Sequence, residues 1–115
     1  MSQNLVEILC RFNKCGPNDL PNALRRRLAE NLEFLNCNKV ITMHLRHNKY
    51  VSTDHFSFMG SNRLYAYRGY MGITVEQHLF SRHRITLKYP QLPCIVEYGS
   101  NGHRSFYPLE LLEFI

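Results

Sequence analysis

The stretch ITLKYPQLPCIVEYG (85–99), with HRSFYPLELLEF (103–114) after it, decides the fold. Both stretches are rich in β-branched and aromatic residues, which favour β-strands. Three apolar segments, separated by prolines and by a Gly-Ser-Asn-Gly turn, lie at 85–89, 94–98 and 105–115. They predict three strands of a small β-barrel or sandwich.

The middle of the chain carries the same kind of pattern. Apolar and β-branched residues alternate from 40 to 45, and a polar turn at 46–48 separates them from a partner strand at 49–56. A Gly-Ser-Asn turn then leads to the aromatic stretch 64–67. These patterns predict two hairpins, the second with exposed aromatic side chains.

Helical spacing is found at the N-terminus and again after the hairpins. Apolar residues at 5–12 predict one short helix, and a leucine stripe over 21–35, with Pro21 as the first helical residue, predicts a second. Thr74 and Gln77 match a capping box, in which both side chains bond backbone groups at a helix start. A third helix is therefore expected at 75–83.

Length and composition limit the class of protein. The chain has 115 residues, of which 44% are hydrophobic, and a formal net charge of +5. This size supports one hydrophobic core, and the charge favours polyanionic partners, namely nucleic acid or anionic membranes. No apolar run approaches the length of a membrane span and no signal peptide is recognisable, so we expect a soluble intracellular protein. Because regular structure is predicted from end to end, we expect one domain, 1–115, cut from a longer protein.

Motifs for several kinds of chemistry are absent from the sequence. There is no phosphate-binding P-loop and no G-x-S-x-G nucleophile motif, and Asp54-His55 lacks a serine partner. The four cysteines stand at irregular intervals without a C-x-x-C pair, which predicts reduced packing residues rather than a zinc site or disulfides. The basic run 25–27 fits either a nucleic-acid contact or a solvated helix face.

Tyrosine, histidine and arginine recur together in the second half of the chain. Aromatic faces stack on unpaired bases, while Arg, His and Tyr donate hydrogen bonds to phosphate oxygens. The same tyrosines also fit a sheet whose hydroxyl groups are solvated. The candidate RNA-binding residues are His44, Tyr50, Tyr65, Tyr67, His78, Arg82, His83, His103, Arg104, Phe106 and Tyr107.

Three of these residues lie on the helix predicted at 75–83. His78 and Arg82 are four residues apart, so they share one face and can clamp one phosphate. His83 is about 140° round the helix from His78, which disfavours a shared metal site. Two histidines and a basic residue are also the groups that a ribonuclease uses for general acid and base steps, although nothing in the spacing demands that chemistry.

The two C-terminal stretches resemble the PAZ domain of Argonaute-family proteins. In that family a strand and an L-K-Y-P-x-L-P-C segment lead to a hairpin and to a strand with a basic residue, an aromatic residue and P-L-E. Here these are 87–94, then His103, Arg104, Phe106 and 108–110. The resemblance is close over 85–112, weaker over 40–83 and only architectural before that. Dicer-type proteins carry the same domain, but LKYPQLPC favours the Argonaute type.

The resemblance implies an α+β fold, mainly β: an OB-like, partly open β-barrel with a hairpin-plus-helix insertion and two N-terminal helices. It also implies that a cleft between barrel and insertion anchors the 3′ end of a small single-stranded guide RNA, in RNA-mediated gene silencing. No enzymatic activity, cofactor or metal is implied. The implied partners are the guide RNA and other domains of the same Argonaute-type chain, with no membrane, and the implied location is the cytoplasm, the nucleus or RNA granules.

The resemblance assigns individual roles. His44 falls on a strand histidine near the pocket, and Tyr50 on a tyrosine that bonds the terminal phosphate. Tyr65 falls on the hairpin aromatic that stacks on the terminal base, with Phe58 or Tyr67 as alternatives. Arg104 or His103 takes the basic position that faces the RNA backbone, and Tyr107 takes the apolar position at the last ribose.

The helix departs from the family pattern. His78 and His83 stand where tyrosines are usual, and Arg82 stands where lysine is usual. An imidazole with an ordinary pKa near 6.5 is partly charged under cellular conditions, so RNA binding is expected to tighten on acidification. The departures also allow a second interpretation, a protein-interaction module that keeps the barrel and has lost the RNA pocket.

Overall fold

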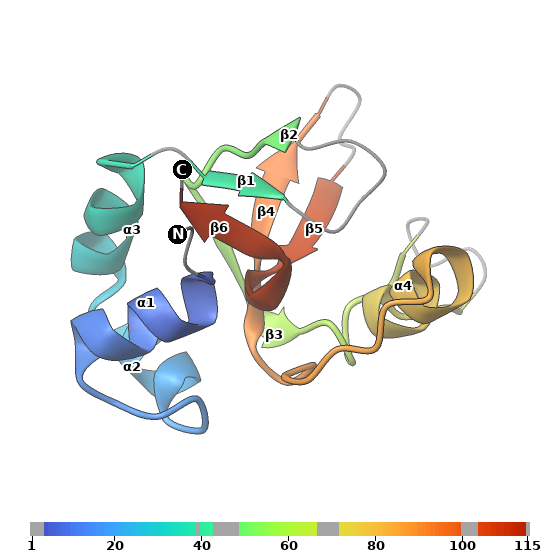
Figure 1. The fold of residues 1–115 in the computed structure, drawn as a ribbon, viewed down its shortest axis with the longest axis horizontal. Coiled ribbons are helices and arrows are strands. Elements are labelled where there is room, and N and C mark those ends of the chain that lie inside the picture. Colours follow the sequence, from blue (N-terminus) through green and yellow to red (C-terminus); the bar gives the residue numbers. More distant parts are fainter. Residues whose placement is uncertain (1–3, 39, 43–48, 67–71, 100–103, 115) are drawn as a thin grey trace.

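Two three-stranded antiparallel sheets form the centre of the molecule, with helices on two opposite sides (Figure 1). This computed structural model describes residues 4–38, 40–42, 49–66, 72–99 and 104–114. The sheets have the strand orders β2-β1-β6 and β3-β4-β5. Their strands are β1 (Val40–Thr42), β2 (Lys49–Tyr50), β3 (Phe56–Gly60), β4 (Pro93–Tyr98), β5 (Arg104–Pro108) and β6 (Leu112–Phe114). The α+β class is confirmed, and the OB-like closure of the sheets stays a prediction.

The N-terminal part holds three helices, so the prediction of two was wrong. They are α1 (Leu5–Asn13), α2 (Leu20–Arg26) and α3 (Leu28–Asn36). The second predicted helix breaks at Arg27, whose backbone has φ −121° and ψ 44°. No described helix is both long enough and apolar enough to cross a membrane.

A buried asparagine lies one turn after the break. Asn31 of α3 is fully buried and exchanges two side-chain hydrogen bonds with Asn13 of α1, at 2.8 and 3.1 Å. Its amide nitrogen also donates to the Arg27 carbonyl at 2.8 Å. A buried amide must be hydrogen-bonded, and the bonds to Asn13 and to the Arg27 carbonyl satisfy Asn31.

The main core lies between these helices and the sheets. It contains Leu5 and Leu9 of α1, Leu24 of α2 and Leu35 of α3, packed against buried residues of the strands. Three aromatic rings extend the contact between the helices and the first sheet. Phe12 stacks on Phe34 with ring centroids 4.3 Å apart, and Phe34 meets Phe114 of β6 edge to face with centroids 5.7 Å apart. The three helices thus cover one side of the sheets (Figure 1).

The segment 85–89 was predicted as a strand, and this was wrong. The carboxylate of Glu110 accepts hydrogen bonds from the backbone amides of Lys88 and Tyr89, at 2.9 and 2.8 Å. A side chain therefore occupies the donors that a neighbouring strand would use, and Pro90 has no amide to extend a ladder. The segment runs without a strand partner into β4.

The predicted strand 105–115 is divided between the two sheets. Pro108 ends β5, a 3₁₀ turn (Leu109–Leu111) follows, and β6 then pairs with β1. The expected strand 49–56 is divided as well. β2 ends at Tyr50, the Ser52 hydroxyl donates to Asp54 at 2.7 Å in a local turn, and Phe56 begins β3 in the other sheet.

The first hairpin and the third predicted helix are confirmed where the chain is described, and the described part of the second hairpin is a single bridge. β1 pairs with β2 in the register Ile41 opposite Tyr50. In the second hairpin Tyr65 bridges to Thr74, while the tip lies outside the described residues. Helix α4 covers Val75–His83, as predicted.

The cysteines are free thiols in three different environments. Cys94 is fully buried on β4, and burial raises the pKa of its thiol to about 12. Cys10 and Cys15 are half-buried against the main core. Cys37 is exposed, so the prediction of a packing role does not hold for it.

Candidate nucleic-acid interface

Helix α4 belongs to an insertion that leaves the second sheet after β3 and returns before β4 (Figure 1). Its start is fixed by the predicted capping box. The backbone amide of Gln77 donates to the Thr74 hydroxyl at 3.2 Å, and the backbone amide of Thr74 donates to Gln77 Oε1 at 2.9 Å. Its end is fixed by Arg84 in the left-handed region, at φ 56°. Both ends of α4 are therefore fixed by local backbone structure, which sets the positions of its side chains.

A second, smaller core joins the insertion to the sheets. It contains Leu64, Val75, Leu79, Leu87, Cys94 and Leu111, with Ile85 and Phe106 packed against it. Val75 and Leu79 are the buried positions of α4, so this face of the helix looks towards the strands. Because Cys94 comes from β4 and Phe106 from β5, the second core sets the position of α4 relative to both strands.

Three of the candidate RNA-binding residues stand on α4. His78 is half-buried, and Arg82 and His83 are exposed. The rings of His78 and His83 meet edge to face with centroids 5.7 Å apart. The two rings lie closer together than their separation of about 140° round the helix suggests, and His83 is the last helical residue.

The charge state of His78 follows from these neighbours. Burial lowers the pKa of His78 below its ordinary value, and the nearby His83 and Arg82 lower it further. A neutral His78 can still donate one hydrogen bond, and an approaching phosphate favours its protonation. The protonation of His78 is therefore sensitive to an anion that binds beside it.

The second hairpin brings an aromatic ring next to the start of α4. Tyr65 pairs with Thr74, the N-cap residue of α4, while its neighbour Leu64 points into the second core. The Tyr65 side chain is 56% exposed. A ring held at its base and open to solvent can stack on an unpaired base.

Strand β5 contributes to both sides of the second sheet. The guanidinium carbon of Arg104 lies over the ring of Phe106, 5.8 Å from its centroid, and Phe106 packs against the second core. Tyr107 belongs to the main core instead and is 8% exposed. Alternation along the strand therefore places Arg104 and Phe106 on the side of the insertion and Tyr107 on the other side.

The remaining candidates are distributed elsewhere. Tyr50 is 66% exposed on β2, the edge strand of the first sheet, which lies well apart from α4 in Figure 1. His44, Tyr67 and His103 lie outside the described residues, and nothing is described of the Phe58 side chain. The structure thus brings Tyr65, His78, Arg82 and His83 together around α4, with Arg104 and Phe106 joined to them through the second core.

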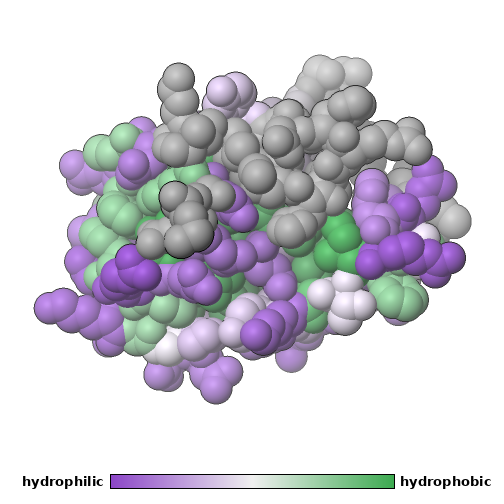
Figure 2. All heavy atoms as spheres, viewed as in Figure 1, coloured by the Kyte–Doolittle hydropathy of each residue, from purple (hydrophilic) through white to green (hydrophobic). Residues whose placement is uncertain are grey.

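This arrangement suits an anion with an apolar portion. Figure 2 shows hydrophilic side chains gathered at the α4 end and hydrophobic atoms exposed between them and the rest of the surface. Imidazole and guanidinium groups donate hydrogen bonds to phosphate, and aromatic rings contact bases or sugars. Within the described ranges no three His, Cys, Asp or Glu residues come together as a metal site.

Two solved structures are similar to the whole chain. The first is a crystal structure of a Drosophila Ago-PAZ domain in complex with RNA that is 2′-O-methylated at its 3′ end, with a TM-score of 0.76 and 24% sequence identity over 100% of this chain and 99% of that one. The chain has the fold of an Argonaute PAZ domain. The second structure, a Drosophila Argonaute 2 PAZ domain studied for 3′-end recognition of nucleic acids, has a TM-score of 0.65 and 21% identity over 100% and 95% of the two chains. No protein-family model and no curated protein matches the sequence.

The PAZ fold also presents residues that sequence reasoning missed. Tyr98 at the end of β4 is 59% exposed, lies opposite Arg104 in the sheet and meets the ring of His55 at 5.0 Å. Asn36 and Asn38 line a pocket with Tyr50. The only signal in the sequence was their polar or aromatic character at the end of a predicted element, which does not distinguish a site from a surface.

Proposed function

We propose that this PAZ-fold domain binds the 3′ end of a small single-stranded RNA between α4 and β5. The observation that supports this most strongly is the cluster of His78, Arg82 and His83 on a helix whose inner face packs on the strands. Clustered donors beside an apolar bed suit a terminal nucleotide, which carries both a phosphate and a flat base. One of the similar structures holds an RNA with a modified 3′ end, and the other concerns 3′-end recognition.

Each candidate residue has a role in this proposal. His78, Arg82 and His83 hold phosphate oxygens, Tyr65 stacks on the terminal base, and Arg104 faces the RNA backbone. Phe106 forms part of the apolar surface that contacts the ribose, and Tyr107 packs behind that surface in the main core. The Tyr50 hydroxyl bonds a phosphate. His44, Tyr67 and His103 keep the roles near the pocket that the resemblance implies.

We propose binding without cleavage. Cleavage by two histidines requires imidazoles on opposite sides of a phosphate. His78 and His83 instead contact each other, with ring centroids 5.7 Å apart. This contact favours two donors on the same side of a phosphate, so bound RNA is expected to remain intact.

The setting of the domain is part of the proposal. The chain spans almost the whole of both similar PAZ domains. We infer that it is one domain, 1–115, of a longer Argonaute-type protein in RNA-mediated gene silencing, and that other domains of that protein are its partners. Such a protein works inside the cell, in the cytoplasm, the nucleus or RNA granules.

A direct test compares RNA ends and salt concentrations. We expect the 115-residue chain to bind a seven-nucleotide RNA with a free 3′ hydroxyl and to lose about ten-fold affinity when a 3′ phosphate adds bulk and charge in a closed end pocket. With two to four phosphates contacted, log affinity should fall against log salt with a slope of roughly −0.7 per contact. Fluorescence anisotropy measures both quantities. Equal affinity for the two ends, or affinity that salt does not change, would contradict the proposal.

The pH dependence provides a second prediction. Phosphate beside His78 favours the charged imidazole, and the pKa of His78 in the free domain is lowered, so RNA binding takes up a proton. Affinity should therefore rise as the pH falls from about 7.5 to about 5.5. Stability should change in the opposite direction, because the unfolded chain binds this proton more readily below about pH 6.5.

Anisotropy measured across this pH range checks the prediction, with His78→Gln as the matched variant. Glutamine keeps a hydrogen-bond donor and does not titrate. The variant should bind RNA with a flatter pH profile than the wild type. A profile that is unchanged in His78→Gln would show that other groups take up the proton.

A protein-interaction module is the second candidate, and one observation favours it. Phe80 is 53% exposed and lines a pocket of about 270 Å³ with Ile85 and Leu87, outside the phosphate-binding cluster of α4. Exposed apolar grooves often bind proteins. The RNA titration above separates the two functions, because a protein-binding module would not distinguish a 3′ hydroxyl from a 3′ phosphate.

A further inference from the structure

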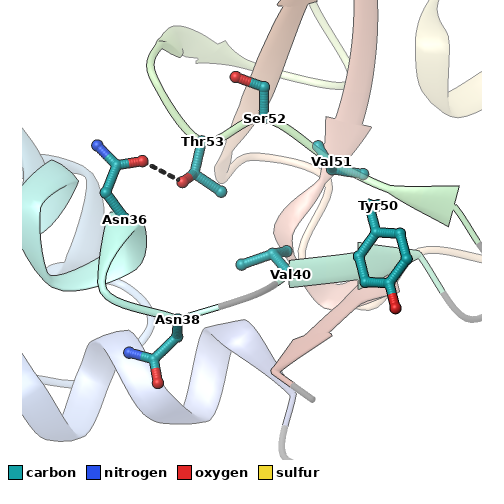
Figure 3. A pocket seen from close by; sticks show the side chains of 7 residues that line it. All are labelled: Asn36, Asn38, Val40, Tyr50, Val51, Ser52 and Thr53. Atoms are coloured by element: carbon teal, nitrogen blue, oxygen red, sulfur yellow. Dashed lines mark hydrogen bonds between the residues drawn. The ribbon is translucent and has the colours of Figure 1, made fainter.

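A pocket of about 460 Å³ lies where the first sheet meets the end of α3 (Figure 3). Asn36 and Asn38 stand on the side of α3, Tyr50 stands on the opposite side, and Val40 and Val51 lie between them (Figure 3). Ser52 and Thr53 complete the lining. This volume is within the range of small-ligand sites.

The lining indicates which chemical class fits. None of its seven residues carries a charge, so the lining favours an uncharged group over a phosphate or an ammonium group. Val40 and Val51 are 2% and 7% exposed, and the Val51 amide donates to the Val40 carbonyl at 2.9 Å, which makes a fixed apolar floor. The Tyr50 ring is 66% exposed and forms a wall. An uncharged, flat, aromatic group meets all three conditions.

The two asparagines add defined polar positions. The Thr53 hydroxyl donates to Asn36 Oδ1 at 2.7 Å, so the oxygen of this amide is held and its nitrogen is the group that can donate to a ligand. Asn38 Nδ2 donates to the Phe34 carbonyl at 3.1 Å, so here the oxygen is the group that can accept. The edge of a nucleobase carries both donors and acceptors, so either amide can bond to it.

We propose that this pocket binds an unpaired nucleobase of the RNA, from a nucleotide upstream of its 3′ end, stacked on Tyr50 with its edge towards Asn36 and Asn38. The inference rests on the proposed function, since it extends the path of the same RNA past Tyr50. Stacking of a base on an aromatic side chain tolerates any base identity, so sequence preference would come only from the asparagines. The pocket lengthens the recognised RNA beyond its terminal nucleotides.

The test is a coupling measurement between one side chain and one base. Asn36→Asp keeps the acceptor for the Thr53 hydroxyl and removes the donor, while Asn22→Asp on exposed α2 adds the same charge elsewhere. Each variant of the 115-residue chain is titrated with a seven-nucleotide RNA and with RNAs that lack one base at a time. The added charge repels the phosphates of all these RNAs alike, so only a base contact appears as coupling.

We expect one upstream position at which removing the base weakens wild-type binding about ten-fold and weakens Asn36→Asp by about two-fold or less. Asn22→Asp should behave like the wild type. A two-nucleotide RNA, too short to reach the pocket, should bind Asn36→Asp and the charge-matched Asn22→Asp equally. Absence of any upstream position coupled to Asn36 would overturn the inference. If the two-nucleotide RNA binds while coupling is absent, the 3′-end function stands alone, whereas failure of both RNAs to bind overturns the function as well.

Discussion

Replacing both His78 and Arg82 with alanine should lower the affinity for a 3′-hydroxyl RNA about 100-fold, or near 3 kcal/mol. The reason is that both side chains donate to phosphate oxygens in the proposed complex, and charge-assisted hydrogen bonds are the stronger kind. The fold should be retained, because alanine favours helices and the inward residues Val75 and Leu79 are unchanged. Anisotropy measures the affinity and thermal unfolding measures the stability.

The matched control is Arg26→Ala on α2. It removes one positive charge from an exposed position of α2, a helix that lies far from α4 in Figure 1. We expect its affinity to stay within about two-fold of the wild type at moderate salt, where distant surface charges are screened. Equal losses for Arg26→Ala and the double variant would show that only net charge matters, and would remove α4 from the binding site.

Replacing Gly60 with alanine should destabilise the domain by about 3 kcal/mol or more. A Cβ at Gly60 would overlap the carbonyl oxygen of Pro90 and the backbone of Gln91. These are main-chain atoms, so no flexible side chain can move aside. The contact lies where the insertion joins the second sheet, and we call the segments 60–62 and 90–91 the neck of the insertion. Here the backbone amide of Asn62 and the hydroxyl of Ser61 also donate to the Pro90 carbonyl, at 3.2 and 3.1 Å. Loss of this neck should weaken RNA binding as well.

Gly16→Ala is the control for this substitution. A Cβ at Gly16 meets open space, so the change should alter stability by no more than about 1 kcal/mol. Chemical denaturation of both variants measures the difference. If Gly60→Ala were as stable as Gly16→Ala, the close approach of Gly60 to the backbone of Pro90 and Gln91 would be contradicted.

The parts of the fold that were predictable from sequence are those fixed by nearby residues. The capping box of Thr74 and Gln77 and the boundaries of α4 depend on contacts within four residues, and the structure has both as predicted. The β1–β2 hairpin follows from alternation and a polar turn. Local spacing carries this information directly.

The errors arose where a distant residue decides local structure. The predicted second helix breaks at Arg27, and Asn31 beyond the break bonds to Asn13, a partner that nothing at 21–35 shows. Glu110 prevents strand pairing at 88–89 from 21 or 22 residues away. Such contacts override intrinsic propensity, and a single sequence does not reveal them.

The candidate site likewise has features that nearby residues predict and features that depend on distant ones. The shared face of His78 and Arg82 follows from helical spacing, whereas the contact between His78 and His83 depends on where the helix ends. The placement of Tyr107 in the main core follows from which side of β5 faces the insertion. The pocket of Asn36, Asn38 and Tyr50 joins three elements and has no sequence pattern.

The most direct test of the 3′-end proposal is a titration followed by backbone amide NMR. A seven-nucleotide RNA with a free 3′ hydroxyl is added to the 115-residue chain, and the same RNA with a 3′ phosphate serves as the comparison. We predict shifts concentrated at Tyr65, over α4 and along β5, and weaker shifts with the 3′ phosphate. Shifts spread evenly over the basic surface, or confined to the groove beside Phe80, would contradict an end-binding site at α4.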